Sequence, residues 1–455
     1  MAGIISVSML SGFFAPAASA DPLLPGLPPL PESPQSFIDS LAPPPESTPH
    51  GPISPAAELP PGKAKDAGLE AYYSTILPSD IGDPFFDRYP DNLSQLTPGE
   101  IITRRDITAS AAPFVGAGVS HVDQVKFRSE DGMGRPSFGT ASLIVPSTEW
   151  AGEGDRPIVV NNTPIDSLGR KCTPGYTMAH GISLTTNPVD YIPPVTALAA
   201  QRGYAVLVPD HQGPRMAYAA PRVAGHIILD SLRAVRSLGP EFDASPIGMT
   251  GYSGGAIATN GAAKLIDSYA PELKGFVKGA ALGGTPLDYE VLSTSMSGVL
   301  NLAKGLLVAA GFGVARENPD ILTKVNNPTL HVAPIFKDLC TIPLAMLGGL
   351  TIPVEFLSNM EDPFQSEFAH GIYERTRMED VPYGAPLYVY NGAQEFWVPS
   401  VMATDLYAEQ CALGTPSVLR LPIGEHFIAA LSGFPEAMQW LDQRLQGVPA
   451  PNECG

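Results

Sequence analysis

The chain has 455 residues, of which 44% are hydrophobic and 16% are charged, and its formal net charge at pH 7 is −19. This composition predicts a well-filled globular core and excludes a largely disordered protein. The negative charge argues against nucleic acid as a partner, because the phosphates would be repelled, and against electrostatic docking on anionic headgroups. A neutral substrate suits this net charge better than an anionic one.

Residues 1–20 predict a secretory signal peptide, because an apolar run at 4–14 precedes the small residues Ala18-Ser19-Ala20, although no Lys or Arg precedes the run. Residues 21–62 are rich in proline and predict a disordered, extended leader outside the core. No other apolar run is long enough to span a bilayer, so no transmembrane segment is expected after signal removal. We expect a protein that is secreted or held in the cell envelope.

Residues 63–285 are predicted to form the first part of a core, with order beginning near 83–86. The segments 125–129 and 139–145, separated by a glycine-containing turn, predict an antiparallel pair of strands. Strands and helices then alternate, with strands expected at 158–160, 204–208, 247–250 and 280–282 and helices at 195–202 and 222–238. This alternation predicts an α/β fold with a mostly parallel sheet covered on both faces.

Within this core, Gly251-Tyr252-Ser253-Gly254-Gly255 matches the G-x-S-x-G pattern of a nucleophile elbow. It follows an apolar strand and precedes small and apolar residues at helical spacing. Glycines are needed beside the serine because side chains would collide in a sharp strand-to-helix turn. The pattern predicts Ser253 as a nucleophile, and the motif alone leaves open a glycine-rich turn that merely contains a serine.

The alternation stops between residues 286 and 381, where apolar helical segments, among them 299–310 and 335–347, follow one another without clear strands. An insertion of this length between core strands is typical of a cap or lid, and ordinary packing of its helices on the core is the other interpretation. Residues 382–455 are predicted to complete the core, with strands at 387–390 and 417–423 and a last helix at 428–445.

A serine nucleophile needs a base and an acid, which in α/β-hydrolases follow it in the order acid, then histidine. Of the eight histidines, His426 follows a late strand and is predicted to be the base. Glu395 follows the strand at 387–390, where the acid is expected, and glutamate can stabilise an imidazolium as aspartate does. Asp405 competes with it but falls in a helical run, and Glu425 is expected to point to the other side of its loop.

The oxyanion of a tetrahedral intermediate needs two hydrogen-bond donors. The backbone N–H of Gly254 is predicted to supply one of them. The second is expected from the loop at 161–169, where Asp166 and Ser167 are both candidates because no H-G-G-G motif is present.

The four cysteines, Cys172, Cys340, Cys411 and Cys454, predict two disulfides in an exported chain, with three possible connectivities. The sequence has no C-x-x-C or H-E-x-x-H spacing, so no metal site is predicted. Acyl transfer by a serine triad requires neither a metal nor an organic cofactor.

With these residues identified, the chain resembles the secretory lipase family of fungi and actinobacteria, of the Candida lipase A type. The resemblance covers residues 83–455. It is carried by Arg128-Ser129-Glu130-Asp131-Gly132, Cys172-Thr173-Pro174, Pro209-Asp210-His211-Gln212-Gly213, Gly251 to Gly255, Ser268-Tyr269-Ala270-Pro271-Glu272-Leu273, Gly283-Gly284-Thr285-Pro286, Glu395 through Pro399, and Gly424-Glu425-His426.

The resemblance implies an α/β-hydrolase with a helical lid that hydrolyses long-chain acyl esters, including triacylglycerols, and meets neutral lipid or ester substrates at a lipid–water interface. It also implies the disulfides Cys172–Cys340 and Cys411–Cys454. The family's second oxyanion donor is an aspartate, to which Asp166 is nearest here, whereas Glu395 departs from the family's aspartate.

Other functions remain compatible with the same residues. A short-chain esterase or an acyltransferase would use the same triad, and a serine peptidase would need a charged pocket for which the sequence has no signature. A non-catalytic lipid-binding or cell-envelope protein could also keep the fold with an altered acid.

Overall fold

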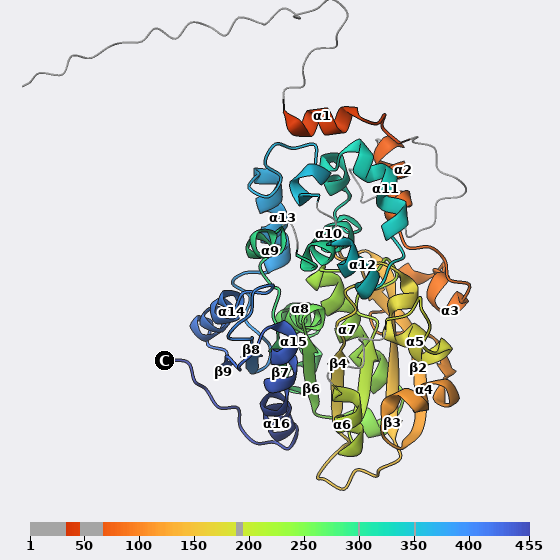
Figure 1. Ribbon diagram of the computed structural model, residues 1–455. Coiled ribbons are helices and arrows are strands. Elements are labelled where there is room, and N and C mark those ends of the chain that lie inside the picture. Colours follow the sequence, from red (N-terminus) through yellow and green to blue (C-terminus); the bar gives the residue numbers. More distant parts are fainter. Residues whose placement is uncertain (1–32, 46–66, 188–193, 299–300, 350–351) are drawn as a thin grey trace, which may run out of the picture.

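A computed structural model describes residues 33–45, 67–187, 194–298, 301–349 and 352–455 (Figure 1). The predicted signal peptide and most of the predicted leader lie outside the described residues. The described part of the leader is not extended, because Pro34–Ser40 forms helix α1, capped at its N-terminus by the side chain of Ser33. None of the described helices is both long enough and apolar enough to cross a membrane.

The described strands form one sheet in the order β1-β2-β3-β5-β4-β6-β7-β8-β9. The pairs from β5 to β9 are parallel, and the pairs β1–β2, β2–β3 and β3–β5 are antiparallel. This arrangement confirms the predicted mostly parallel sheet with an antiparallel start. The strands are β1 Ile101–Asp106, β2 Val119–Glu130, β3 Pro136–Pro146, β4 Ile158–Asn162, β5 Ala205–Pro209, β6 Ile247–Tyr252, β7 Val277–Gly283, β8 Leu387–Tyr390 and β9 Ser417–Arg420.

Helices cover both faces of the sheet (Figure 1). Ile158 and Val160 of β4 belong to the apolar cluster that contains α7 and α8, whereas Val159 belongs to the cluster that contains α6 and α16. Every residue of β4, β5 and β6 is buried, as expected for central strands of a parallel sheet that is covered on both faces. The core helices are α3 Pro84–Asp87, α4 Thr108–Val115, α5 Pro174–His180, α6 Val195–Gln201, α7 Pro221–Arg236, α8 Gly254–Tyr269, α14 Val401–Ala412, α15 His426–Ser432 and α16 Phe434–Leu445.

The chain between β7 and β8 forms helices that gather beyond one end of the sheet, and we call this part the helical insertion (Figure 1). Its helices are α9 Tyr289–Met296, α10 Ala303–Ala315, η7 Pro319–Lys324, α11 Asn327–Phe336, α12 Thr341–Leu347, η8 Val354–Leu357 and α13 Glu367–Arg377. Helix α2 Ala67–Ile76, which lies in the segment predicted as core, packs on this insertion, and the Tyr73 hydroxyl donates to the carbonyl of Arg316.

Three predicted helices have different bounds in the structure. The expected helix at 335–347 is two helices, because α11 ends at Phe336 and α12 begins at Thr341 after Cys340, which is disulfide-bonded to the core. The expected helix at 428–445 is divided at Gly433 into α15 and α16. The helix expected at 299–310 is α10, which runs from Ala303 to Ala315.

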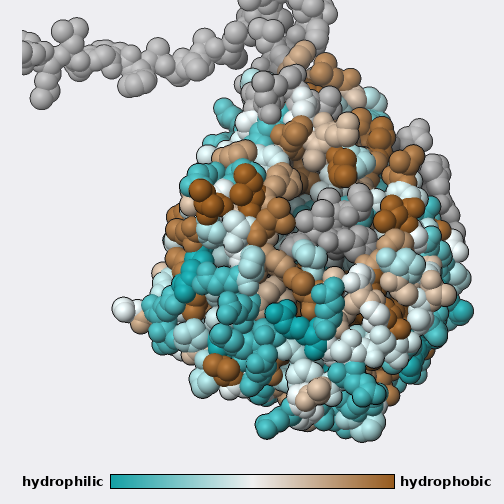
Figure 2. Space-filling view, turned by 60° about the horizontal axis from the view of Figure 1, so that its bottom comes forward, coloured by the Kyte–Doolittle hydropathy of each residue, from teal (hydrophilic) through white to brown (hydrophobic). Residues whose placement is uncertain are grey.

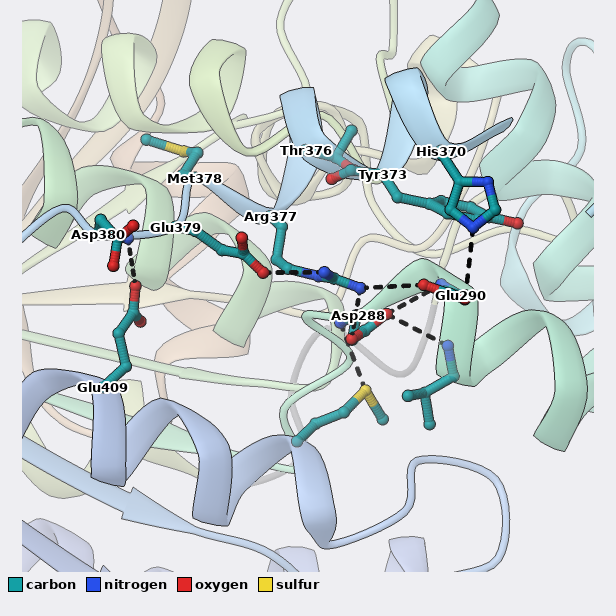
Figure 3. A network of polar contacts seen from close by, with 12 residues as sticks. Asp288, Glu290, His370, Tyr373, Thr376, Arg377, Met378, Glu379, Asp380 and Glu409 are labelled. Atoms are coloured by element: carbon teal, nitrogen blue, oxygen red, sulfur yellow. Dashed lines mark hydrogen bonds and ion pairs between the residues drawn. The ribbon is translucent and has the colours of Figure 1, made fainter. Parts of the chain in front are cut away.

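A charged cluster joins the two ends of the helical insertion (Figure 3). Arg377, the last residue of α13, places Nη2 2.8 Å from Asp288 Oδ2 and 3.4 Å from Glu290 Oε2. Its Nη1 lies 2.8 Å from Oε1 of Glu379. Asp288 also caps α9, so one guanidinium connects the entry of the chain into the insertion with its exit.

Candidate active site

Ser253 lies in a strained turn between strand β6 and helix α8. Its φ of 54° and ψ of −121° are rare for a residue with a side chain, and such backbone strain is typical of functional sites. A Cβ on Gly251 would lie 2.1 Å from the carbonyl oxygen of Gly255, and a Cβ on Gly254 would lie 1.7 Å from Oδ1 of Asp166. The flanking glycines are therefore required by close packing, as the elbow pattern predicts.

His426 is the first residue of α15, and its Nε2 lies 3.0 Å from Oγ of Ser253. The hydroxyl of Tyr252, the residue before Ser253, donates to the carbonyl of His426 and so fixes the backbone of His426 beside the elbow. Glu425 is the N-cap of α15 and accepts from two backbone N–H groups of that helix. This carboxylate is therefore engaged away from the imidazole.

Glu395 is the acidic partner of His426, with Oε2 2.7 Å from Nδ1. Its other oxygen accepts from the backbone N–H groups of Phe396, Trp397 and Val398 at 3.0, 2.9 and 3.3 Å. Burial alone would raise the pKa of Glu395, but the bonds from His426 and from the backbone outweigh it and lower the pKa. The carboxylate therefore stays ionised beside the imidazole. The competing Asp405 is exposed on α14.

Asp166 faces the elbow from the loop after β4. It is buried, and its φ of 42° lies in the left-handed region. Burial raises the pKa of Asp166 to about 7, although the charge of His426, the N–H of Gly254 and the hydroxyl of Tyr218 act to lower it. Up to that pH the carboxyl is neutral, and a neutral carboxyl has an O–H to donate.

Ser167, the other candidate donor, is engaged elsewhere. Its hydroxyl donates to the carbonyl of Ile165 and accepts from the N–H of Thr341 at 3.0 Å. The structure thus brings Ser253, His426, Glu395, Gly254 and Asp166 together, and it turns Ser167 toward the helical insertion. Tyr218 and Thr341 could not be identified from the sequence, because neither lies in a motif and both reach the site only through the fold.

An apolar cavity of about 760 Å³ opens on Ser253 and His426 and extends into the helical insertion. This volume lies in the upper part of the range of ligand pockets, about 300–1,000 Å³. Its walls include Leu306, Phe312 and Ile372 of the insertion.

Apolar side chains surround the mouth of this cavity. Ile342 and Met346 of α12 and Phe427 and Leu431 of α15 line the cavity and are also exposed, Met346 to 71% and Phe427 to 63%. In Figure 2, hydrophobic residues gather in the upper part of the view, and hydrophilic residues cover most of the lower part. Contiguous exposed apolar side chains usually mark a binding surface.

Two disulfides tie the described chain together, Cys172–Cys340 and Cys411–Cys454, which are the pairings that the resemblance implies. The first joins the loop after β4 to the helical insertion. Across the described ranges, no group of three or more His, Cys, Asp or Glu side chains is arranged to hold a metal ion.

Comparison with known proteins gives matches over most of the chain. A family model described as "Secretory lipase" matches residues 179–453. Lipase 10 of Candida albicans is 26% identical over 410 residues, which are 84% of this chain and 86% of that protein. The secreted triacylglycerol lipase LIP3 of Malassezia restricta is 25% identical over 386 residues, 81% of this chain and 80% of its own length.

Solved structures agree with the fold. Candida antarctica lipase A in its closed state superposes with a TM-score of 0.74 at 25% identity, over 83% of this chain and 89% of that one. A mutant of the rice cell wall degrading esterase LipA from Xanthomonas oryzae has a TM-score of 0.56 at 17% identity, over 77% of this chain and all of that one (100%). The second likeness concerns the fold alone. Together they confirm the predicted α/β-hydrolase fold.

Proposed function

Because this chain belongs to the secretory lipase family, we propose that Ser253, His426 and Glu395 hydrolyse long-chain acyl esters, with triacylglycerols as the substrate class. The observation that carries the proposal is a continuous chain of hydrogen bonds. Oγ of Ser253 lies 3.0 Å from Nε2 of His426, and Nδ1 of His426 lies 2.7 Å from Oε2 of Glu395. Ser253 and His426 also line an apolar cavity that is large enough for an acyl chain.

Acylation begins when Oγ of Ser253 attacks the ester carbonyl carbon and its proton passes to Nε2 of His426. The imidazolium is stabilised by the ionised carboxylate of Glu395, which stays unprotonated. The tetrahedral intermediate then breaks its bond to the alcohol oxygen, and His426 returns the proton to that oxygen. The alcohol leaves, and the acyl group remains esterified to Ser253.

Deacylation repeats these steps with water. His426 takes a proton from water as its oxygen attacks the acyl carbon, and the second tetrahedral intermediate releases the fatty acid when Ser253 recovers its proton. The charge on the carbonyl oxygen is met in both halves by the N–H of Gly254, at the N-terminus of α8, and by Asp166. The neutral carboxyl of Asp166 supplies an O–H donor there.

The apolar cavity is assigned to the acyl chain, whose burial replaces contact with water by contact with Leu306, Phe312 and other apolar side chains. We propose that residues 286–381 act as the lid over this site. The exposed apolar mouth at α12 and α15 suits contact with a neutral lipid–water interface. The net charge of −19 makes an uncharged lipid surface the favoured partner over an anionic bilayer.

The protein acts outside the cell. Its family is secretory, and two disulfides suit the oxidising conditions of an extracellular protein.

Release of fatty acid from an emulsified long-chain triacylglycerol at constant pH tests the function. We expect the wild-type protein to release fatty acid and Ser253→Ala to lose activity by at least about a thousandfold. Ser237→Ala, which changes a serine at the end of α7, serves as the matched control. Full activity in Ser253→Ala, or no release by the wild type from any acyl ester, would contradict the proposal.

A further inference from the structure

Thr341 of the helical insertion contacts the loop that carries Asp166 through its side-chain hydroxyl. The hydroxyl of Thr341, the first residue of α12, lies 2.9 Å from the carbonyl oxygen of Ile165 and 3.3 Å from that of Asp166. The side-chain amide of Asn187 donates to the same hydroxyl at 2.9 Å. Because a hydroxyl has one proton, the nearer carbonyl, that of Ile165, is its principal acceptor.

This bond acts on the peptide that leads into Asp166. The carbonyl of Ile165 and the Cα of Asp166 belong to one planar trans peptide, so a donor that fixes the carbonyl also fixes the Cα from which the Asp166 carboxyl extends. Asp166 has a φ of 42°, a backbone conformation that needs support from its surroundings. Asn187 donates to the same carbonyl at 3.0 Å, so side chains from separate segments converge on this peptide.

The residues beside Thr341 reinforce the attachment. The N–H of Leu168 donates to the carbonyl of Leu339 at 3.0 Å, and Cys340 is bonded to Cys172. The fully buried guanidinium of Arg316 donates to the carbonyls of Leu168 and Lys337 at 2.8 and 3.0 Å. The loop after β4 and the segment before α12 therefore form one hydrogen-bonded unit.

We propose that Thr341 is a positioning residue for ester hydrolysis, because its hydroxyl holds the Ile165–Asp166 peptide in the orientation in which Asp166 meets the oxyanion. The inference rests on the proposed function, and it assigns to the helical insertion a role in the chemical step besides covering the acyl cavity. Donors of an oxyanion hole must be held in place before charge develops, so a loosened loop lowers the rate of reaction more than it lowers substrate binding.

Thr341→Val and Thr341→Ser form a matched pair for the test, because valine keeps the shape and removes the hydroxyl, and serine keeps the hydroxyl. On a soluble short-chain ester we expect kcat of the valine variant to fall about tenfold with KM nearly unchanged. The serine variant should stay within about threefold of the wild type. Thr323→Val changes an exposed threonine of η7 whose hydroxyl bonds only locally, and it should leave kcat unchanged.

An inhibitor pair separates the oxyanion hole from the acyl cavity. An alkylboronic acid adds to the serine as a tetrahedral anion, whereas an alcohol of the same chain length fills the cavity without forming one. We expect Ki for the boronic acid to rise about tenfold in Thr341→Val while Ki for the alcohol stays constant. If the valine variant does not fold, Thr341→Ala gives the same comparison.

An unchanged kcat in Thr341→Val, equal losses in the valine and serine variants, or a loss confined to KM would overturn the inference. These outcomes leave the proposed function standing, since that function fails only if Ser253 proves dispensable. Weakened binding of the alcohol to the same extent as the boronic acid would assign Thr341 to the cavity wall instead, and it would also overturn the inference.

Discussion

Oε2 of Glu395 lies 2.7 Å from Nδ1 of His426, while Oε1 of the same carboxylate accepts from three successive backbone N–H groups. The turn after β8 therefore wraps around the carboxylate and fixes its orientation. Glutamate is one methylene longer than aspartate, and the backbone donors hold that longer side chain against the imidazole. This relationship explains how a glutamate at this position reaches the imidazole of His426.

Glu395→Gln should lower kcat by about 10³–10⁴-fold, because an amide in place of the carboxylate favours the wrong imidazole tautomer and removes the charge that stabilises imidazolium. Glu395→Asp should lower kcat less, because it keeps the charge but draws the carboxylate back by about 1.5 Å. Steady-state kinetics on a soluble ester measure both effects. Asp405→Asn is the control, and a larger loss in that variant than in Glu395→Gln would show that the acid has been misassigned.

Asp166→Asn should change the pH dependence of activity. The pKa of Asp166 is raised to about 7, so the O–H donor is present below that pH and is lost as the pH rises through it. An amide donates at every pH in this range. The ratio of wild-type kcat to that of Asp166→Asn should therefore fall as pH rises from about 6 to 8, and a constant ratio would show that the carboxyl is not the donor.

The titration of the Asp166 carboxyl should also make the folding stability depend on pH. Because the folded pKa of Asp166 lies above its usual value of 3.8, the folded state binds more protons than the unfolded state between these pH values. The contribution of Asp166 to the free energy of unfolding is therefore largest below about pH 4. It declines as the pH rises and levels off above about pH 7. The Tm of wild type relative to Asp166→Asn, measured from pH 4 to 8, should fall in that window, and a relative Tm that rises with pH would contradict the raised pKa.

Gly311→Leu should shorten the preferred acyl chain. Gly311 lines the cavity from α10, and a Cβ built there has no neighbour within 4 Å, so we expect a leucine to narrow the cavity without displacing the backbone. We expect kcat/KM for palmitate esters to fall at least about tenfold while that for butyrate esters is unchanged. Gly371→Leu is the control on α13, where a Cβ also has open space. Equal losses on both chain lengths would count against the assignment of the acyl site.

Arg377→Gln should destabilise the protein by about 1–2 kcal/mol, because it leaves Asp288, Glu290 and Glu379 close together without their shared cation. The loss should shrink at high salt, since the pairs are partly exposed and screened. Unfolding monitored by circular dichroism gives the difference. Lys274→Gln removes one exposed pair, with Asp267, and should change stability by less than about 0.5 kcal/mol. A loss in Arg377→Gln no greater than in this control would argue against a structural role for the cluster.

Ser253, His426 and Glu395 could be predicted from the sequence because each is tied to a strand end whose place in the fold is set by local pattern. Thr341 could not, since it reaches the loop after β4 only through contacts between residues about 175 positions apart. The break between α11 and α12 escaped prediction for the same reason, because a disulfide and a loop contact interrupt an apolar run that reads as one helix. Strand β1 was missed because Arg104 and Arg105 point to partners on other segments, as an edge strand allows.

The proposed function requires that Ser253 becomes acylated. The most direct measurement is treatment of the active protein with an alkyl fluorophosphonate, followed by intact-mass determination and peptide mapping, with residual esterase activity followed in parallel. We expect one adduct per chain, located on Ser253, with activity lost in proportion to labelling. Full activity after complete labelling, an adduct on another residue that tracks the loss, or an active enzyme that resists labelling would contradict it.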